Sequence, residues 1–205
     1  MTPFAGLLAS IPSPSSGTIS IGPLKIHAYG LMIALGVVAA VWLLGKRLEQ
    51  ARIGNADDAN AIAVWSVIAG VIGSRLYHVA TDWSAFEHHL SDIPKIWQGG
   101  LGIPGGLAFG IPVGVLMIRR RGMPVGIALN CAAPTLPLAQ AIGRWGNYFN
   151  QELFGRPTTL PWGLRIDLPQ IQELPGKYAS LPAGTTFQPT FLYESLLNFI
   201  LCGLL

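Results

Sequence analysis

The chain has 205 residues, of which 51% are hydrophobic and 11% are charged, and its mean hydropathy is +0.47. So few charged side chains cannot cover the surface of a soluble globule of this size, which excludes an ordinary soluble protein and predicts an integral membrane protein. The formal charge of +3 comes from scattered basic residues without interleaved aromatic side chains, which excludes a nucleic-acid-binding surface.

The N-terminal part is predicted to hold an arm and two membrane spans. Residues 1–27 are rich in proline and begin without a basic segment, which favours an N-terminal arm over a cleavable signal peptide. Within it, weak alternation over Thr18–His27 predicts a short hairpin on the membrane surface. The uncharged run Ala28–Gly45 would be roughly 27 Å long as a helix, enough for a first span. Ala59–Ser74 is the second uncharged run.

The C-terminal part is predicted to hold two complete spans, an arm and the start of a fifth span. Ile96–Ile118 is the longest uncharged run, and Gly122–Gly143 follows it as the fourth span. Residues 148–187 contain too many prolines for a long helix, but alternation over Trp162–Leu168 predicts one half-buried strand. Residues 188–205 start a further helix that the chain end cuts, which we interpret as a C-terminally truncated part of a longer protein.

The predicted fold class is an all-α polytopic membrane protein with about five transmembrane helices and a small extracytoplasmic arm that contains a strand. The expected domains are the arm 1–27, the four-helix membrane core 28–147, the extracytoplasmic arm 148–187 and the helix start 188–205. Basic residues follow the first and third spans: Lys46, Arg47, Arg52, Arg119, Arg120 and Arg121. The loop after the second span has only Lys95, so the positive-inside rule places that loop, the N-terminus and the second arm outside.

Polar side chains concentrate directly after the fourth span, in the stretch Gly143–Gly155. If the fourth helix continues, Arg144, Asn147 and Gln151 share one of its faces. A guanidinium held by amides and a carboxylate suits a lipid phosphate. The alternative is an arginine that only extends to the headgroups. Arg75, at the end of the second span, would either add a second cation or serve the structure alone.

Glycines recur at four-residue spacing along the third span: Gly102, Gly106, Gly110 and Gly114. This pattern predicts close helix packing, and the alternative is that the missing side chains leave room for an acyl chain. Gly99-Gly100 and Gly105-Gly106, together with Pro104, predict a broken helix at the outer end of this span. Free amides at such a break could face an anion.

Two histidines and a tyrosine lie at predicted outer ends of helices. His27 and His78 would either titrate near a site or form interfacial hydrogen bonds. Tyr29 would either line a site or act as an ordinary interfacial aromatic residue. Cys131 and Cys202 lie in apolar runs without metal-ligand or disulfide spacing, so we predict small buried hydrophobic residues and no metal site.

The spacing Gly143-Arg144-x-Gly146-Asn147-x-x-Asn150-x-Glu152-x-x-Gly155 resembles the signature of the prolipoprotein diacylglyceryl transferase family. Similar segments run through the chain: His27-Ala28-Tyr29-Gly30-Leu31, Gly73-Ser74-Arg75-Leu76-Tyr77, Trp97-Gln98-Gly99-Gly100-Leu101-Gly102-Ile103-Pro104-Gly105-Gly106 and Gln188-Pro189-Thr190-Phe191-Leu192-Tyr193-Glu194. The resemblance implies seven transmembrane helices in the full family and a bacterial cytoplasmic (inner) membrane location, with the site near the extracytoplasmic face.

The implied reaction is transfer of an sn-1,2-diacylglyceryl group from phosphatidylglycerol to the lipobox cysteine thiol of prolipoproteins, with release of glycerol phosphate. The implied partners are phosphatidylglycerol, prolipoprotein signal peptides and membrane lipid, with no cofactor and no nucleic acid. The residues implied as catalytic are Arg144, Asn147, Glu152 and Tyr29. Those implied to bind phosphatidylglycerol are Arg144, Arg75, Asn150, Gly155, Gly105 and Gly106. Further candidates are His78, Tyr193 and Glu194.

Two departures from the family pattern matter. Pro104 stands where many relatives have a histidine that has been proposed to activate the thiol, so the base remains open. The family also continues through two more spans with a functional arginine, so we expect these 205 residues alone to show impaired or no catalysis. The alternatives are a multi-pass transporter or lipid-binding membrane protein, with Arg75 and Arg144 as its anion site, or a noncatalytic relative.

Overall fold

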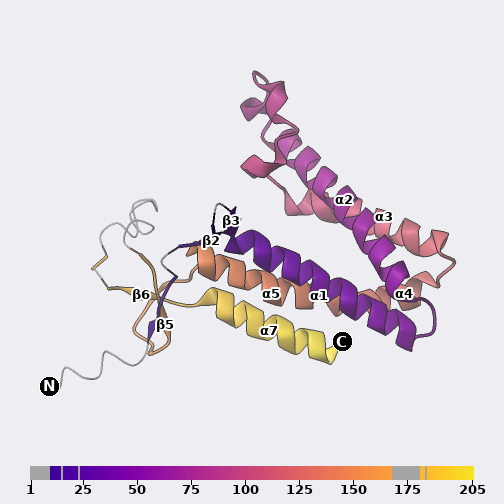
Figure 1. Cartoon of the computed structure of the whole chain (residues 1–205). Coiled ribbons are helices and arrows are strands. Elements are labelled where there is room, and N and C mark those ends of the chain that lie inside the picture. Colours follow the sequence, from indigo (N-terminus) through magenta and orange to yellow (C-terminus); the bar gives the residue numbers. More distant parts are fainter. Residues whose placement is uncertain (1–9, 15, 23, 168–180, 183) are drawn as a thin grey trace. The chain divides into compact units, whose positions relative to one another are not determined.

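The computed structural model describes residues 10–14, 16–22, 24–167, 181–182 and 184–205. Its contacts divide the chain into two compact units. One unit consists of residues 1–40 and 134–205, and the other of residues 41–133. Helix α1 (Ala28–Gln50) begins in the first unit and ends in the second. Figure 1 labels the α-helices of both units and the strands β2, β3, β5 and β6 of the first unit.

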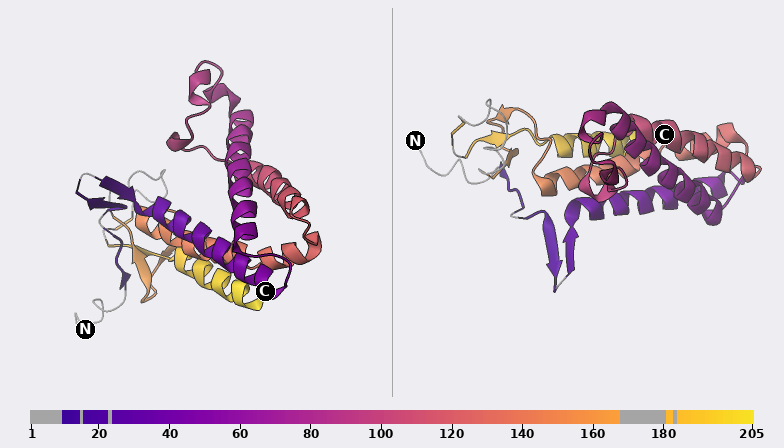
Figure 2. Two further views of the ribbon diagram at one scale, coloured as in Figure 1. Left: turned by 45° about the vertical axis from the view of Figure 1, so that its right-hand side comes forward. Right: turned by 90° about the horizontal axis from the view of Figure 1, so that it is seen from above.

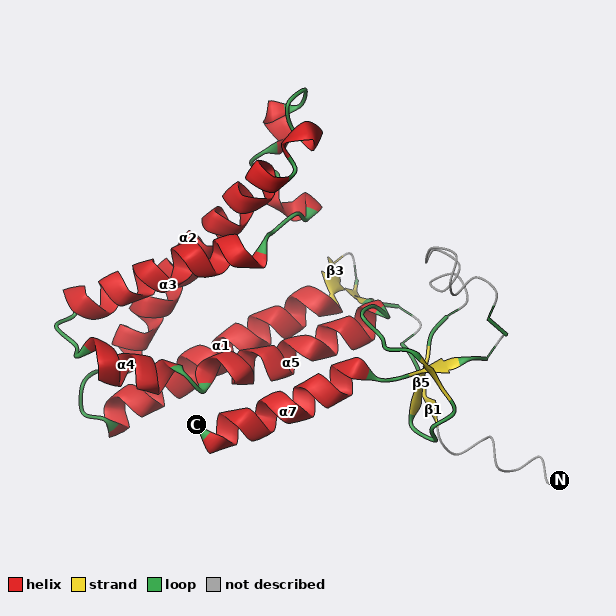
Figure 3. Cartoon of the chain, turned by 180° about the vertical axis from the view of Figure 1, so that it is seen from behind, coloured by secondary structure: helices red, strands yellow, loops and turns green. Residues whose placement is uncertain are grey.

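Three helices pack together in the first unit: α1, α5 (Thr135–Asn150) and α7 (Thr190–Leu204). Helix α1 approaches α5 at Gly36, where a Cβ atom would lie only 2.8 Å from the carbonyl oxygen of Ala139. Between α5 and α7, the buried hydroxyl of Ser195 donates to the carbonyl oxygen of Ala141 at 2.9 Å. Helix α5 therefore lies between α1 and α7, as Figure 3 shows.

A small sheet lies at the N-terminal end of α7 (Figure 3). Its order is β1–β5–β6–β4, in which β1 pairs parallel with β5 and the other pairs are antiparallel. The strands are β1 (Ser10–Ile11), β4 (Pro157–Thr158), β5 (Gly163–Arg165) and β6 (Thr186–Phe187). Leu164, Ile166, Phe187 and Phe191 form its buried core. Because Phe191 belongs to α7, this core anchors the sheet to the helix bundle.

The predicted hairpin is confirmed over Thr18–His27, and the predicted strand is present but shorter than expected. The hairpin consists of β2 (Thr18–Ile21) and β3 (Leu24–His27), which pair antiparallel and are visible as two arrows in Figure 2. Among the described residues of the predicted strand Trp162–Leu168, Gly163–Arg165 form the paired strand. Trp162 is exposed, and Leu168 lies outside the described residues. The alternating pattern of apolar residues therefore located the strand correctly, but the pattern is longer than the part that pairs with a neighbouring strand.

The second unit is built on a pair of helices, α2 (Ala56–Thr81) and α3 (Ile103–Arg120), followed by the short α4 (Val125–Ala132). Three single-turn helices connect the pair: η1 (Trp83–Ala85), η2 (Leu90–Asp92) and η3 (Ile96–Gln98). Asn55 and Asp58 form a reciprocal capping box at the start of α2. The buried core of this unit consists of Leu44, Leu48, Ala59, Ile62, Ile118, Met123, Ala128 and Cys131. That core closes the end of the unit opposite the connecting loop.

The predicted close packing of the glycine stripe is confirmed. A Cβ at Gly106 would lie 2.6 Å from Ser74 Oγ, and one at Gly110 would lie 3.1 Å from the carbonyl oxygen of Ser66. Gly105 is tighter still, since its Cβ would lie 2.2 Å from the carbonyl oxygen of Gly73. Helix α2 fills the space beside these glycines, so the interpretation that they leave room for an acyl chain is wrong.

We expect Gly105→Ala to destabilise the second unit by about 1–3 kcal/mol, because the added methyl group meets the backbone of α2. Gly126→Ala is the matched control, since nothing lies within 4 Å of a Cβ at that helical position. The control should be neutral or slightly stabilising. Thermal unfolding of the detergent-solubilised protein measures both variants. Equal midpoints for the two variants would contradict this account of the α2–α3 contact.

Four segments are long and apolar enough to cross a membrane: Ala28–Gln50, Ala56–Thr81, Ile103–Arg120 and Val125–Asn150. Helix α7 is a shorter apolar helix that starts at Thr190, directly after Pro189, as predicted. The arrangement is therefore that of a polytopic membrane protein with a small strand-containing arm. Helices α1 and α2 run beyond the predicted Ala28–Gly45 and Ala59–Ser74 because polar turns continue each helix past its uncharged part.

Two predicted spans were wrong in detail for reasons of backbone conformation. The third helix begins at Ile103 instead of Ile96, because Gly99 and Gly100 adopt φ angles of 89° and 73° that end η3. The predicted break is thus present there, whereas Gly105-Gly106 lie inside α3. The fourth span is interrupted before Pro134, which separates α4 from α5, and it then runs to Asn150 instead of ending at Gly143.

Candidate functional site

Arg144 lies in the last two turns of α5 and contacts side chains from two helices. Its Nη1 donates to Asn147 Oδ1 at 3.3 Å, one helical turn away. Its Nη2 lies 2.6 Å from Glu194 Oε2, which α7 contributes from its second turn. The Arg144 side chain is 25% exposed and that of Glu194 is 41% exposed. The guanidinium is therefore held in place by the protein and still open to solvent or lipid.

Asn147 links this ion pair to a second carboxylate. Its side chain is buried, and its Nδ2 donates to Glu152 Oε1 at 2.9 Å. Asn150 Nδ2 approaches the same oxygen at 3.4 Å. Helix α5 continues to Asn150, so Arg144 and Asn147 share a face as predicted, whereas Gln151 is the left-handed C-cap and lies outside the helix. The result is one connected polar network, Glu194–Arg144–Asn147–Glu152–Asn150, in which each side chain orients the next.

Two glycines of the motif allow close approaches around this network. A Cβ at Gly146 would lie 2.7 Å from Cδ2 of Tyr29, so the ring of Tyr29, from the first turn of α1, packs directly on α5. The Tyr29 hydroxyl has no hydrogen-bond partner among the residues that the structure describes. Gly155 donates its N–H to the carbonyl oxygen of Gln188 at 2.9 Å, and a Cβ there would lie 2.7 Å from Gln188 Cβ. Its role in the structure is this close contact with the segment before α7.

Tyr193 supports the arm next to the network. Its hydroxyl donates to Gln188 Oε1 at 2.7 Å and accepts from Trp162 Nε1 at 2.8 Å. Gln188 Nε2 in turn donates to Thr158 Oγ1 at 3.0 Å. Tyr193 thus ties the start of α7 to the sheet, whereas its neighbour Glu194 contacts Arg144. Tyr193 and Glu194 thus have different environments, which the sequence motif that contains both of them did not predict.

Gln151 was predicted to share a helix face with Arg144 and Asn147, but it is the left-handed C-cap of α5, and its side chain bonds to Asp167, which sequence reasoning missed. The buried Gln151 side chain makes two hydrogen bonds with Asp167 and one with the carbonyl oxygen of Pro14. No local signal marks Gln151 as the residue that ends the helix, because the left-handed conformation usually selects glycine or asparagine. Its pairing with Asp167 depends on tertiary structure.

Arg75 belongs to the second unit, where it holds the loop between α2 and α3. Its side chain is buried and donates to four backbone carbonyl groups, at distances of 2.6–3.2 Å: those of Asp92, Ile93, Gly99 and Gly100. Its guanidinium carbon also lies 5.1 Å from the ring centroid of Phe86. These contacts agree with the structural alternative for Arg75, and its predicted role in lipid binding stays a prediction.

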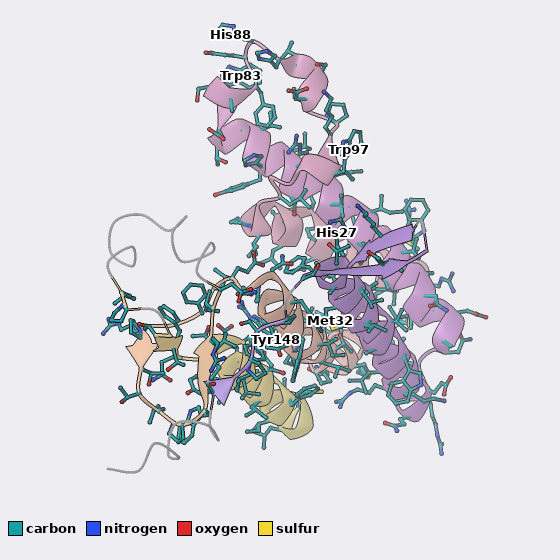
Figure 4. All side chains as sticks on the ribbon, turned by 60° about the vertical axis from the view of Figure 1, so that its left-hand side comes forward. His27, Met32, Trp83, His88, Trp97 and Tyr148 are labelled. Atoms are coloured by element: carbon teal, nitrogen blue, oxygen red, sulfur yellow. The ribbon has the colours of Figure 1, made fainter. Side chains whose placement is uncertain are left out.

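His78 lies beside Arg75 and packs edge-on against the Phe86 ring at 5.6 Å. Its ring also fills the space where a Cβ at Gly100 would lie. The loop carries the exposed Trp83 and Trp97, which Figure 4 labels. Within the loop, the Lys95 ammonium donates a hydrogen bond to Asp92 and lowers the pKa of that carboxyl. The described contacts of His78, Gly105 and Gly106 are packing contacts, and their predicted site roles stay predictions.

We expect Arg75→Lys to destabilise the loop by about 2 kcal/mol, because an ammonium cannot reach all four carbonyl groups and leaves some of them unpaired. Arg119→Lys, in the last turn of α3, is the matched control and should have little effect. Limited proteolysis between residues 82 and 102, followed by mass spectrometry, measures the change. Equal cleavage of the two variants would contradict the assignment of Arg75 to loop stability.

Comparison with known proteins agrees with the resemblance noted in the sequence. The family model described as prolipoprotein diacylglyceryl transferase matches residues 16–205. The chain is 48% identical over 202 residues to a phosphatidylglycerol–prolipoprotein diacylglyceryl transferase of Frankia alni, covering 97% of this chain and 51% of that protein. It is 44% identical over 215 residues to the protein of the same name from Rhodococcus jostii, covering 100% of this chain and 59% of that protein.

A third relative is phosphatidylglycerol–prolipoprotein diacylglyceryl transferase 2 of Streptomyces coelicolor. It is 45% identical over 205 residues, which cover 97% of this chain and 61% of that protein. The chain therefore spans about half the length of the curated relatives it matches.

Proposed function

The chain belongs to the prolipoprotein diacylglyceryl transferase family, and from that membership we propose that the protein containing it transfers an sn-1,2-diacylglyceryl group from phosphatidylglycerol to a lipobox cysteine thiol. The products would be a thioether-linked prolipoprotein and glycerol phosphate. The observation that carries the proposal is the network centred on Arg144, which places a partly open guanidinium at the end of an apolar helix.

The chemistry of the reaction fits such a site. A thiolate sulfur forms the new bond to the glyceryl carbon while the bond from that carbon to the phosphate ester oxygen breaks. Negative charge therefore moves from the sulfur to the departing phosphate, and a fixed cation near that phosphate lowers the barrier. Arg144 is the cation that we assign to this role, because it is the arginine of the network and is not fully buried.

The contacts of Arg144 support an anion site. Glu194 Oε2 already lies 2.6 Å from its Nη2, so an anionic oxygen fits this edge of the guanidinium. The other contact, with Asn147 at 3.3 Å, uses one N–H of Nη1. Among the residues that the structure describes, no further acceptor contacts this guanidinium, so its other N–H donors can bind a phosphate that approaches from the open side. Asn147 and Glu152 would keep the guanidinium oriented while the bound phosphate changes from substrate to product.

The proposed location is the bacterial cytoplasmic membrane, with the site at its extracytoplasmic face. Four membrane-length apolar segments support the location in a membrane. The basic residues after the first and third spans support the proposed orientation in it. The proposed partners are phosphatidylglycerol and prolipoprotein signal peptides that carry a lipobox cysteine. Phosphatidylglycerol and a signal peptide of that kind both reach the site from within the bilayer, which is consistent with a site at the end of α5.

A transfer assay tests the proposal. The full-length protein, reconstituted in vesicles with phosphatidylglycerol labelled in its diacylglyceryl group, should transfer the label to a lipobox peptide and release glycerol phosphate. A peptide with serine in place of the lipobox cysteine is the control and should stay unlabelled. Transport of a solute without any thioether product would contradict the proposal and favour the transporter alternative.

A further inference from the structure

Two strained residues flank Glu152. Gln151 and Leu153 have φ angles of 53° and 52°, in the left-handed region that side chains with a Cβ rarely adopt. Among the described residues, Arg52 is the only other non-glycine residue with a positive φ. A strained backbone persists only where surrounding contacts hold it, so the contacts of this turn identify what fixes Glu152.

The side chain of Gln151 holds one side of the turn. Its Nε2 donates to the carbonyl oxygen of Pro14 at 2.9 Å and to Asp167 Oδ2 at 2.7 Å. Its Oε1 accepts the backbone N–H of Asp167 at 2.8 Å. Gln151 is 6% exposed, so these bonds are shielded from water. One carboxamide therefore joins the end of α5 to the N-terminal segment and to the segment after β5.

Hydrogen bonds to backbone groups of the turn hold its other side. The Thr190 hydroxyl, at the first residue of α7, donates to the carbonyl oxygen of Leu153. The Leu153 side chain is 65% exposed, so packing of that side chain does not explain its conformation. The N–H of Glu152 donates to the carbonyl oxygen of Asn147 at 3.1 Å. The turn thus presents the Glu152 carboxylate to Asn147 from a backbone that is fixed at both ends.

We propose that Gln151 is a positioning residue for the Arg144 network and acts through Glu152. By holding the left-handed turn, its carboxamide keeps Glu152 Oε1 2.9 Å from Asn147 Nδ2, and Asn147 in turn orients the Arg144 guanidinium. This role rests on the proposed diacylglyceryl transfer. It explains why a glutamine occupies a backbone position that favours glycine: the bonds made by its side chain offset the unfavourable conformation.

A double-mutant cycle in the full-length protein tests the proposal. Gln151→Gly relaxes the backbone and removes the carboxamide, and we expect kcat/KM for transfer to fall about 10-fold. In a Glu152→Gln background, the same change should lower the rate less than twofold further, because its effect passes through Glu152. Arg52→Gly is the matched control, since it relieves a similar φ of 55° in the second unit and should leave transfer unchanged. A wild-type rate for Gln151→Gly, or full multiplication of the two effects, would overturn the proposal.

A second pair of variants keeps the test decisive if Gln151→Gly folds poorly. Gln151→Glu places a carboxylate against Asp167 and should also lower transfer about 10-fold. Adding Asp167→Asn restores an amide–carboxylate pair with reversed polarity but not the bond to the carbonyl oxygen of Pro14, so it should recover part of the lost rate. Absence of any recovery in a folded double variant would count against the proposed positioning role.

Amide hydrogen exchange separates this proposal from the proposed function. Peptides covering residues 148–156 should exchange faster in Gln151→Gly, whereas peptides from α2 and α3 should keep their protection. If the parent protein transfers no diacylglyceryl group, the proposed function fails, and the exchange measurement alone then decides whether Gln151 holds the turn. Unchanged protection over residues 148–156 would overturn that assignment.

Discussion

Replacing Arg144 with alanine should lower kcat/KM for diacylglyceryl transfer by about 10²–10³-fold in the full-length protein. The physical reason is that Arg144 is the cation that we assign to the departing phosphate, and alanine leaves that charge without its fixed partner. The change also leaves Glu194 and Asn147 without their contacts at 2.6 Å and 3.3 Å. Transfer of labelled lipid to a lipobox peptide, measured in reconstituted vesicles, gives the rate.

Two further variants show whether charge alone accounts for the effect. Arg144→Lys keeps the cation but loses the second donor branch, so it cannot contact Asn147 and Glu194 together, and we expect it to stay at least about 10-fold below wild type. Arg120→Ala removes an exposed arginine from the last turn of α3 and should leave the rate unchanged. A wild-type-like rate for folded Arg144→Ala would exclude Arg144 as the phosphate site.

The sequence predicted the parts of the fold that depend on local composition. Uncharged runs located the spans, because lipid excludes charged side chains over about 20 residues of helix. The ends of the helices followed other rules. Gly99 and Gly100 end η3 through positive φ angles, and Pro134 divides the fourth span, and neither effect changes the hydropathy of the run. The charged turns that extend α1 to Gln50 likewise lie outside any uncharged segment.

The candidate site divides in the same way. The contact of Arg144 with Asn147 follows from their spacing of three residues on one helix, and the sequence predicted it. Glu194 comes from a different helix, so only its place in a family-like segment marked it as a candidate. Arg75 shows the opposite limit: as an arginine at the end of an apolar helix it resembled Arg144, but its surroundings are backbone carbonyl groups. Tertiary contacts distinguish two arginines that their local sequences do not.

Asn147 is the second residue at which we expect a large effect. Asn147→Leu keeps the number and branching of the heavy atoms in this buried side chain but removes the amide between Arg144 and Glu152. Both charged groups then lose a hydrogen bond, so we expect kcat/KM to fall by about 10–10²-fold. Asn147→Asp should be at least as damaging, because it keeps the contact with Arg144 but places a second carboxylate where the 2.9 Å bond to Glu152 now lies.

Comparison of these two variants shows which half of the network matters. If the contact with Arg144 alone were sufficient, Asn147→Asp would retain activity that Asn147→Leu loses. If Asn147 must also hold Glu152, both variants fail, and Glu152→Gln in the Asn147→Asp background should recover part of the rate because the two side chains can then share a hydrogen bond again. Asn198→Leu is the matched control, since the only hydrogen bond of its amide among the described residues goes to the backbone carbonyl oxygen of Glu194 within α7. Near-wild-type transfer by folded Asn147→Leu would mean that Arg144 is oriented without Asn147, and that the connected network is not required for the reaction.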